Sequence, residues 1–270
     1  MNRSLLVVAL LAPGFLRAEE PFVAAKYLTI VRGDLPIVLS APHGGRMPVP
    51  GVAIRKGEGV EQFVTVRDDN TAEVTLALAA TIEKAFGAKP HVVIAHFERK
   101  FVDVNRPASG AYEAKEVAPL YDAYHAALDA ACKQVKADWG RGLLLDIHGQ
   151  AAEVDGVFRG TVGGKSVSLL IQRYGPTALV GEKSLLGVLE AKSYKILPGC
   201  KDEDQKETKF GGGHITQSYG SHTAHAIDAI QLELGTNLRA KVNHEKLVAD
   251  LLAAIQTFSK AYLPEKKVQK

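Results

Sequence analysis

The sequence predicts an α/β fold built around a central strand that is covered on both faces. Short apolar runs at Leu35–Ala41, His91–Ala95 and Gly142–Gln150 predict strands, and the third contains a continuous leucine run without the alternation of a half-exposed strand. Apolar residues recur every fourth position from Val74 to Phe86 and form one stripe along Val117–Lys136, which indicates amphipathic helices. The chain therefore alternates between buried strands and one-sided helices.

The second half of the chain continues with shorter elements. Ile227–Leu234 alternates and predicts a strand, and Ser166–Gln172 and Tyr194–Leu197 are expected to be further short strands. A helix is expected around Glu182–Lys192, and a last amphipathic helix follows Asn243. No internal repeat is visible in the sequence.

Composition indicates one large globular domain. Of the 270 residues, 46% are hydrophobic and 23% are charged, which is enough for a sizeable core. We expect a single domain over residues 19–264 and a polar tail at 265–270. The net charge is only +3, and lysines and arginines are scattered, so the sequence carries no footprint of a nucleic-acid-binding protein.

The first 18 residues have the features of a secretory signal peptide. Arg3 precedes an apolar run at Leu5–Ala12, and a small residue, Ala18, stands at the expected cleavage site. The run is far shorter than the roughly 20 residues of a membrane-spanning helix. We therefore expect export to the periplasm or the extracellular space, with no membrane attachment after cleavage. Whether Cys132 and Cys200 pair in that compartment is left open by the sequence.

Two predicted strands end in a histidine followed by glycine. His43 follows Leu35–Ala41, and His148 lies near the end of Gly142–Gln150, two residues after Asp146. In open α/β sheets, ligands bind at the carboxyl ends of the strands. A neutral histidine there can ligate a metal, or act as a base that a neighbouring carboxylate orients. For His148, a core or capping histidine is the alternative.

Carboxylates stand at two further positions of interest. Asp68 and Asp69 precede the predicted helix that contains Val74, where one of them or the next asparagine can serve as the helix cap. A carboxylate left over could complete a metal site with the two histidines. Glu233 lies inside an apolar strand, where an unpaired carboxylate costs several kcal/mol. Two histidines, a carboxylate and a glutamate are the inventory of a catalytic zinc site.

Arginines and a glycine-rich stretch add possible ligand contacts. Arg99, Asp103 and Asn105 are expected on differing faces of an extended segment, with Arg106 just past its end. The arginines could form surface ion pairs or bind an anion such as a carboxylate. The glycine-rich stretch at 210–220 offers His214 and Thr216 but matches no phosphate-binding pattern. No serine nucleophile motif is present in the sequence.

Six short motifs, taken together and in order, resemble the N-formylglutamate amidohydrolase family. They are Pro42–Gly45, Arg67–Thr71, Arg99 with Asp103–Arg106, Leu145–Gln150, Gly212-Gly213 with Thr216 and Tyr219-Gly220, and Gln231–Glu233. The resemblance runs from about Pro36 to Arg239. It implies a three-layer αβα fold with a mixed central sheet, related to the zinc carboxypeptidases.

The resemblance also assigns roles to individual residues. It implies one zinc ion held by His43, Asp68 and His148, with Asp68 preferred over Asp69 because it stands three residues before Thr71. The same resemblance implies that Glu233 is the general base and that Arg99 stabilises the oxyanion. It also implies that Asn105 and Arg106 bind a substrate carboxylate.

The activity implied is hydrolysis of an amide bond in an N-formyl or N-acyl amino acid, or in a short peptide, that carries a carboxylate. The predicted export suggests substrates other than formylglutamate. A secreted metallocarboxypeptidase, a cell-wall amidase and a non-catalytic binding protein on the same fold are the alternatives.

Overall fold

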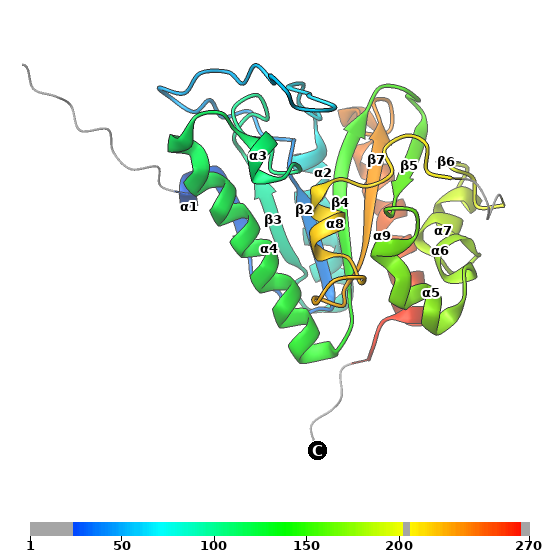
Figure 1. Ribbon diagram of the computed structural model, residues 1–270. Helices are drawn as coiled ribbons and strands as arrows, with labels where there is room; N and C mark the ends of the chain where they lie inside the picture. Colours follow the sequence, from blue (N-terminus) through cyan, green and yellow to red (C-terminus); the bar gives the residue numbers. More distant parts are fainter. Residues whose placement is uncertain (1–23, 202–205, 266–270) are drawn as a thin grey trace, which may run out of the picture.

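A seven-stranded mixed sheet forms the centre of the molecule in the computed structural model, which describes residues 24–201 and 206–265 (Figure 1). The predicted signal peptide and nearly all of the polar tail lie outside these residues. The strands follow the spatial order β1-β3-β2-β4-β7-β5-β6. Their bounds are β1 Leu28–Val31, β2 Ile37–Ala41, β3 His91–Ala95, β4 Leu143–Gln150, β5 Gly156–Gly160, β6 Lys195–Leu197 and β7 Asp228–Gly235.

The four central strands, β3, β2, β4 and β7, are parallel, while β1 and β5 run antiparallel to their neighbours β3 and β7. β6 pairs in parallel with β5 at the edge. The carboxyl ends of parallel strands meet at one edge of a sheet, so β2, β4 and β7 deliver their last residues to the same place. The register pairs His148 of β4 with Glu233 of β7.

Helices cover both faces, as the three-layer prediction requires (Figure 1). One face packs against α2 (Thr71–Phe86), α7 (Leu185–Ala191) and α9 (His244–Tyr262), and the other against α4 (Ala118–Trp139) and α8 (His214–Tyr219). Strand β4 serves both layers because its side chains alternate. Leu143, Leu145 and Ile147 belong to the first apolar core, and Leu144 belongs to the second.

Shorter helical segments complete the chain. They are α1 Ala24–Tyr27, α3 Ala108–Ala111, α5 Ser168–Tyr174 and α6 Thr177–Val180, with 3₁₀ turns at Lys115–Val117, Lys165–Val167 and Lys241–Asn243. Within the described ranges, no helix is both long and apolar enough to cross a membrane. Cys132 and Cys200 are buried free thiols rather than a disulfide.

The strand expected at Ser166–Gln172 is wrong, because this segment forms a 3₁₀ turn and helix α5. Its buried apolar residues, Val167 and Leu170, are three positions apart, which is a helical spacing that the short apolar run conceals. The helix also starts against β7. The Leu170 amide donates to Asp228 Oδ1 over 3.0 Å, and the Ser166 hydroxyl donates to the Ala229 carbonyl over 2.5 Å. Tertiary contacts thus decide the local conformation.

The two-sided burial of β4 predicts a large stability effect there. Leu144→Ala removes a fully buried side chain and should lower the free energy of unfolding by about 2–5 kcal/mol, since a cavity remains. Leu76→Ala is the matched control, because Leu76 is 42% exposed on α2 and its loss should cost less than about 0.5 kcal/mol. Urea unfolding measures both values. Equal effects of the two substitutions would contradict the assigned core.

Candidate metal centre

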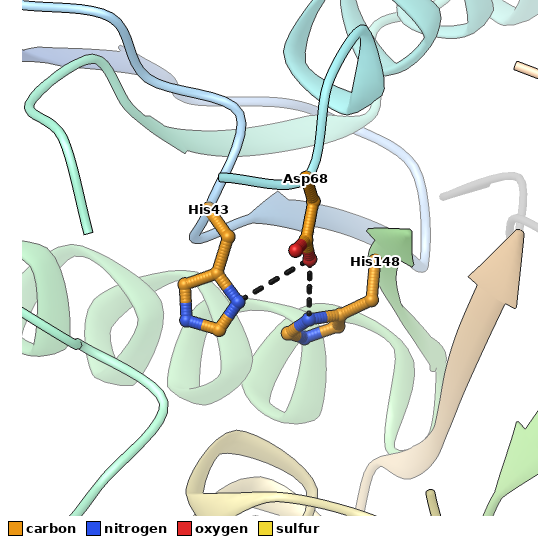
Figure 2. Close-up of side chains that lie close together, drawn as sticks. All are labelled: His43, Asp68 and His148. Atoms are coloured by element: carbon orange, nitrogen blue, oxygen red, sulfur yellow. Dashed lines mark ion pairs between the residues drawn. The ribbon is translucent and has the colours of Figure 1, made fainter. Parts of the chain in front are cut away.

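Three side chains converge at the carboxyl edge of the parallel strands (Figure 2). Asp68 Oδ2 lies 3.4 Å from His43 Nδ1 and 3.3 Å from His148 Nδ1. One ligand atom from each of the three residues lies within 4.8 Å of the others, and all three residues are buried. The structure therefore brings together the three predicted metal ligands.

Backbone contacts hold Asp68 between the two histidines. Its amide donates to the His43 carbonyl over 3.1 Å, and its Oδ2 accepts from the Gly149 amide over 3.1 Å. Its carbonyl accepts from the Thr71 hydroxyl at the start of α2 over 2.8 Å. Asp69 instead points outward, with its side chain 54% exposed and paired with Arg67. The preference for Asp68 over Asp69 thus agrees with the geometry.

Two further carboxylates orient the histidine rings. His43 Nε2 lies 2.7 Å from Asp103 Oδ1, and His148 Nε2 lies 2.8 Å from Asp146 Oδ2. A carboxylate can only accept, so each ring carries its proton on Nε2 when neutral and turns the Nδ1 lone pair toward Asp68. Ser40 donates to the other oxygen of Asp146. Carboxylates placed behind histidines in this way are characteristic of metal ligands.

The donor set fits a divalent cation. His43 Nδ1 is buried and has no hydrogen-bond partner among the described residues, which is costly for a polar atom unless something binds it. Burial tends to raise the pKa of Asp68, but the interactions with the adjacent His148 and His43 rings outweigh burial and hold that pKa well below its usual range. Two imidazole nitrogens and an ionised carboxylate facing one another match the ligand types of zinc.

Glu233 stands beside the triad. Its Oε1 lies 4.0 Å from His148 Nδ1 and accepts from Gln231 Nε2 over 2.9 Å. Burial raises the pKa of Glu233 to about 7, with His148 opposing and Asp68 adding to the shift. A carboxyl group with such a pKa can take up or release a proton near neutral pH. This is the environment that a general base requires.

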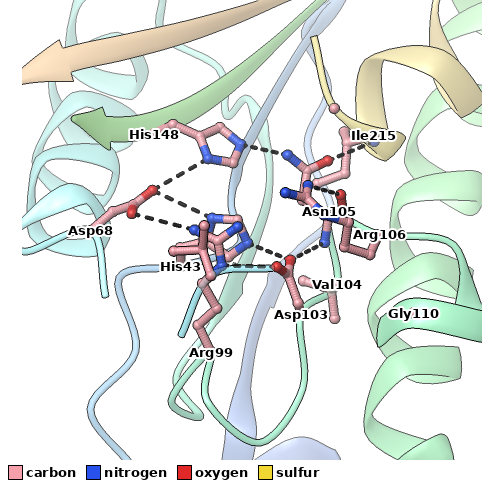
Figure 3. A network of polar contacts seen from close by, with 12 residues as sticks. His43, Asp68, Arg99, Asp103, Val104, Asn105, Arg106, Gly110, His148 and Ile215 are labelled. Atoms are coloured by element: carbon pink, nitrogen blue, oxygen red, sulfur yellow. Dashed lines mark hydrogen bonds and ion pairs between the residues drawn. The ribbon is translucent and has the colours of Figure 1, made fainter. Parts of the chain in front are cut away.

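The segment after β3 folds into turns rather than the predicted extended segment, so that expectation is wrong. Phe101 donates to the Glu98 carbonyl over 3.0 Å, and Arg106 to the Asp103 carbonyl over 3.1 Å. These turns bring Arg99 Nε to 2.8 Å from Asp103 Oδ2, and Arg99 Nη1 lies 3.9 Å from Asp68 Oδ1. Figure 3 shows the histidines and this segment joined in one network.

Asn105 and Arg106 approach the triad from the same turns. Asn105 Nδ2 lies 3.2 Å from His148 Nε2, and its Oδ1 accepts from the Ile215 amide over 2.9 Å. Arg106 donates to the Asn105 carbonyl and to the Gln62 carbonyl, each over 3.0 Å. Both side chains line the same cavity as the triad.

A cavity of 710 Å³ opens over the triad. Its lining includes Glu233, Arg99 and segments of two loops, at residues 62–68 and 207–213. Thr216, a predicted substrate contact, is not among its lining residues. Thr216 is fully buried, and its hydroxyl donates to the Gly213 carbonyl over 3.1 Å. Its role is therefore to stabilise the loop at residues 207–213.

Sequence reasoning assigned no role to Asp103 and Gln231, which hold His43 and Glu233. Asp103 stands 60 residues from His43, and only its place in a motif singles it out. Gln231 had a clearer signal, because it lies two residues before Glu233 on β7 and so on the same face of the strand. A buried polar side chain usually has a specific hydrogen-bond partner, so the buried Gln231 on β7 invites a functional role.

The parallel-strand edge, the buried His–Asp–His triad and the adjacent carboxyl group define a class, that of α/β proteins with a candidate metal centre of the hydrolase type. Comparison with known proteins narrows this class. The chain is 25% identical over 239 residues to N-formylglutamate deformylase of Pseudomonas aeruginosa, covering 77% of this chain and 83% of that one. The deformylase of Pseudomonas putida is also 25% identical, over 242 residues.

A solved structure has a similar fold. N-formylglutamate amidohydrolase from Ralstonia eutropha matches with a TM-score of 0.61 and 16% identity, over 87% of this chain and 98% of that one. A search of family models found no match. The sequence relatives confirm the resemblance that the motifs indicate, since the chain is similar to two N-formylglutamate deformylases over most of its length. The solved structure confirms the fold that this resemblance implies.

The triad predicts loss of metal without loss of fold. His148→Ala should reduce bound zinc from one ion per chain to nearly none, because two protein ligands rarely hold zinc. Elemental analysis of the purified protein measures the metal, and circular dichroism checks the fold. His96→Ala is the control, since His96 bonds Thr29 outside the triad. Full zinc occupancy in folded His148→Ala protein would contradict the assignment.

The carboxylate behind His43 predicts a graded effect. Asp103→Asn keeps the size of the side chain but weakens the hold on the His43 ring, so metal affinity should fall about 10- to 100-fold. Competition with a chromogenic chelator measures that affinity. Asp155→Asn, an exposed residue paired with Asn237, is the matched control and should leave the affinity unchanged. Unaltered affinity in Asp103→Asn would remove Asp103 from the site.

Proposed function

We propose that the protein hydrolyses an amide bond in an N-formyl or N-acyl amino acid that carries a carboxylate. The observation that carries the proposal is the buried His43–Asp68–His148 triad with Glu233 beside it, at the floor of one cavity. The names of the two sequence relatives, both N-formylglutamate deformylases, support a substrate like N-formylglutamate.

The three residues of the triad would hold one zinc ion. When bound, zinc supplies Lewis acidity, which polarises the scissile carbonyl and lowers the pKa of water to about 7. The two rings present their Nδ1 atoms because Asp103 and Asp146 occupy their Nε2 atoms. These residues therefore set the site in place before substrate arrives.

Glu233 would move the proton. Its Oε1 is engaged by Gln231, which leaves Oε2 to take a proton from the attacking water. The same oxygen then delivers the proton to the nitrogen of the leaving amine. A pKa of about 7 suits both steps, since the group can accept and release a proton at neutral pH.

Cationic and amide groups on the other wall would bind the negative parts of the substrate. Arg99 is anchored through Nε to Asp103, which leaves its outer nitrogens to stabilise the oxyanion that forms at the carbonyl. Asn105 and Arg106 would bind the carboxylate of the amino acid. A guanidinium is suited to this task because it pairs with a carboxylate through two parallel bonds.

The cavity also favours a second candidate, an acyl group larger than formyl or a short peptide. Phe63, Val64, Val66 and Phe210 contribute to its lining, and the Val66 side chain is 73% exposed. Apolar side chains at the rim can cover an apolar acyl chain. Export, proposed from residues 1–18, would agree with peptide or N-acyl amino acid substrates.

The test of the function is zinc analysis combined with a substrate panel. We expect one zinc ion per chain and hydrolysis of at least one of a set of N-formyl, N-acetyl and dipeptide substrates with free carboxylates. Absence of turnover across the panel after zinc is added would favour a binding protein on this fold.

Glu233→Gln separates catalysis from binding. The amide cannot accept the proton, so kcat should fall about 10²- to 10⁴-fold while the zinc content stays unchanged. Steady-state kinetics and metal analysis of the same preparation measure the two quantities. The control is Glu182→Gln, an exposed position in the loop before α7. Unchanged kcat in Glu233→Gln would assign the proton transfer to another group.

A further inference from the structure

The segment that carries Asn105 and Arg106 has no regular secondary structure, so something else must fix the direction of these side chains. A loop residue misplaced by 1 Å can lose much of its binding contribution. In Figure 3 the segment lies beside two helices of the same face, identified in Figure 1 as α4 and α8. Contacts from these helices could therefore fix the positions of Asn105 and Arg106.

Two side chains of α4 bind backbone carbonyls of this segment. His125 Nε2 lies 2.9 Å from the Val104 carbonyl, and the Tyr121 hydroxyl donates to the Arg106 carbonyl over 3.0 Å. These carbonyls lie on either side of Asn105. The Asn105 side chain is itself held by the Ile215 amide at the start of α8. Three donors from two helices thus fasten three consecutive residues.

The His125 ring is enclosed by other rings. Its centroid lies 4.3 Å from that of Tyr121, 5.3 Å from that of His214 and 6.0 Å from that of Tyr219. Burial and the neighbouring His214 lower the pKa of His125 to about 4, so the ring is neutral at neutral pH. Because a carbonyl only accepts, the single ring proton lies on Nε2 and is donated to Val104.

The Tyr121 hydroxyl has a support of the same kind. His214 Nε2 lies 3.3 Å from it and can donate to its oxygen, while the hydroxyl proton goes to Arg106. The result is a chain of hydrogen bonds from His214 of α8 through Tyr121 to the segment Val104–Arg106, which we call the carboxylate-binding segment. None of these groups lines the cavity over the triad.

We propose that His125 and Tyr121 are positioning residues that aim Asn105 and Arg106 at the substrate carboxylate through the Val104 and Arg106 carbonyls. This inference rests on the proposed function, because it deepens the role given to Asn105 and Arg106. The α4 residues touch neither the triad nor Glu233, so they set affinity for the carboxylate and leave the chemical step to other groups.

The test compares three variants in the full-length, zinc-loaded protein. His125→Phe keeps a ring but removes the donor, His125→Gln restores an amide donor near the Nε2 position, and Tyr121→Phe removes the hydroxyl alone. His225→Phe is the matched control, because His225 bonds Asp129 of the same helix rather than the carboxylate-binding segment. Zinc content and thermal melting are recorded for each.

The substrates are N-formyl-L-glutamate and its diamide, in which both carboxylates are uncharged. We expect His125→Phe and Tyr121→Phe to raise KM for N-formyl-L-glutamate about three- to tenfold, with kcat nearly unchanged, since each loses one directed hydrogen bond. The diamide should show no such change. His125→Gln should recover most of the affinity, and His225→Phe should behave as the wild type.

Calorimetric binding of N-formyl-L-glutamate to Glu233→Gln protein, with and without His125→Phe, separates this inference from the proposed function. Weaker binding with His125→Phe supports the positioning role even if the wild type shows no turnover. Turnover by the wild type with equal KM in all variants overturns the positioning role and leaves the function in place. Equal losses for N-formyl-L-glutamate and the diamide also overturn it, because they indicate general damage to the fold.

Discussion

The bonds from Asp103 and Asp146 to the two histidines are the interactions on which the site depends. Without them, each imidazole could rotate or move its proton to Nδ1, and the lone pairs would no longer meet at Asp68. Burial also makes these bonds hard to lose, because an unpaired carboxylate inside the protein is costly. The orientation of the triad therefore follows from hydrogen bonds placed behind it, and any bound cation finds its ligands already arranged.

The two walls of the cavity have different origins, and this follows from the order of the strands. His148 and Glu233 stand on paired strands in a fixed register, so their separation is set by the sheet itself. Arg99, Asn105 and Arg106 come from turns after β3, which lies two strands away from β4. The rigid wall carries Glu233, the group proposed for proton transfer. The wall made of turns carries the groups proposed for substrate recognition, and helices must hold it.

Much of this arrangement could be predicted from the sequence. The strands that end in His43 and His148 are continuous apolar runs, and parallel strand ends necessarily meet. A metal-binding carboxylate is expected before α2 because three polar residues exceed the need of one helix cap, and the family resemblance selects Asp68 among them. The structure shows that Asn70, at the cap position, makes no capping bond through its side chain. Local patterns are informative here because secondary structure positions the residues.

The remaining features depend on contacts that no local pattern encodes. Asp103 meets His43 only because turns reverse the chain after β3, and the helix at Ser168–Tyr174 forms where a sequence reading expects a strand. His125 looks like an ordinary helix residue until the Val104 carbonyl is placed beside it. In each case a long-range hydrogen bond gives the residue its role. Such long-range hydrogen bonds cannot be predicted from the spacing of residues in the sequence.

The charges around the triad give an independent reason for a cation. Asp68, Asp103 and Asp146 are buried together, and the buried arginines that pair with them within the described residues are Arg55 and Arg99. Both arginines pair with Asp103, so they compensate mainly one side of the cluster. Carboxylates in excess of cations in a buried region carry a large electrostatic cost. A divalent ion between His43, Asp68 and His148 would offset that excess at the point where lone pairs face one another.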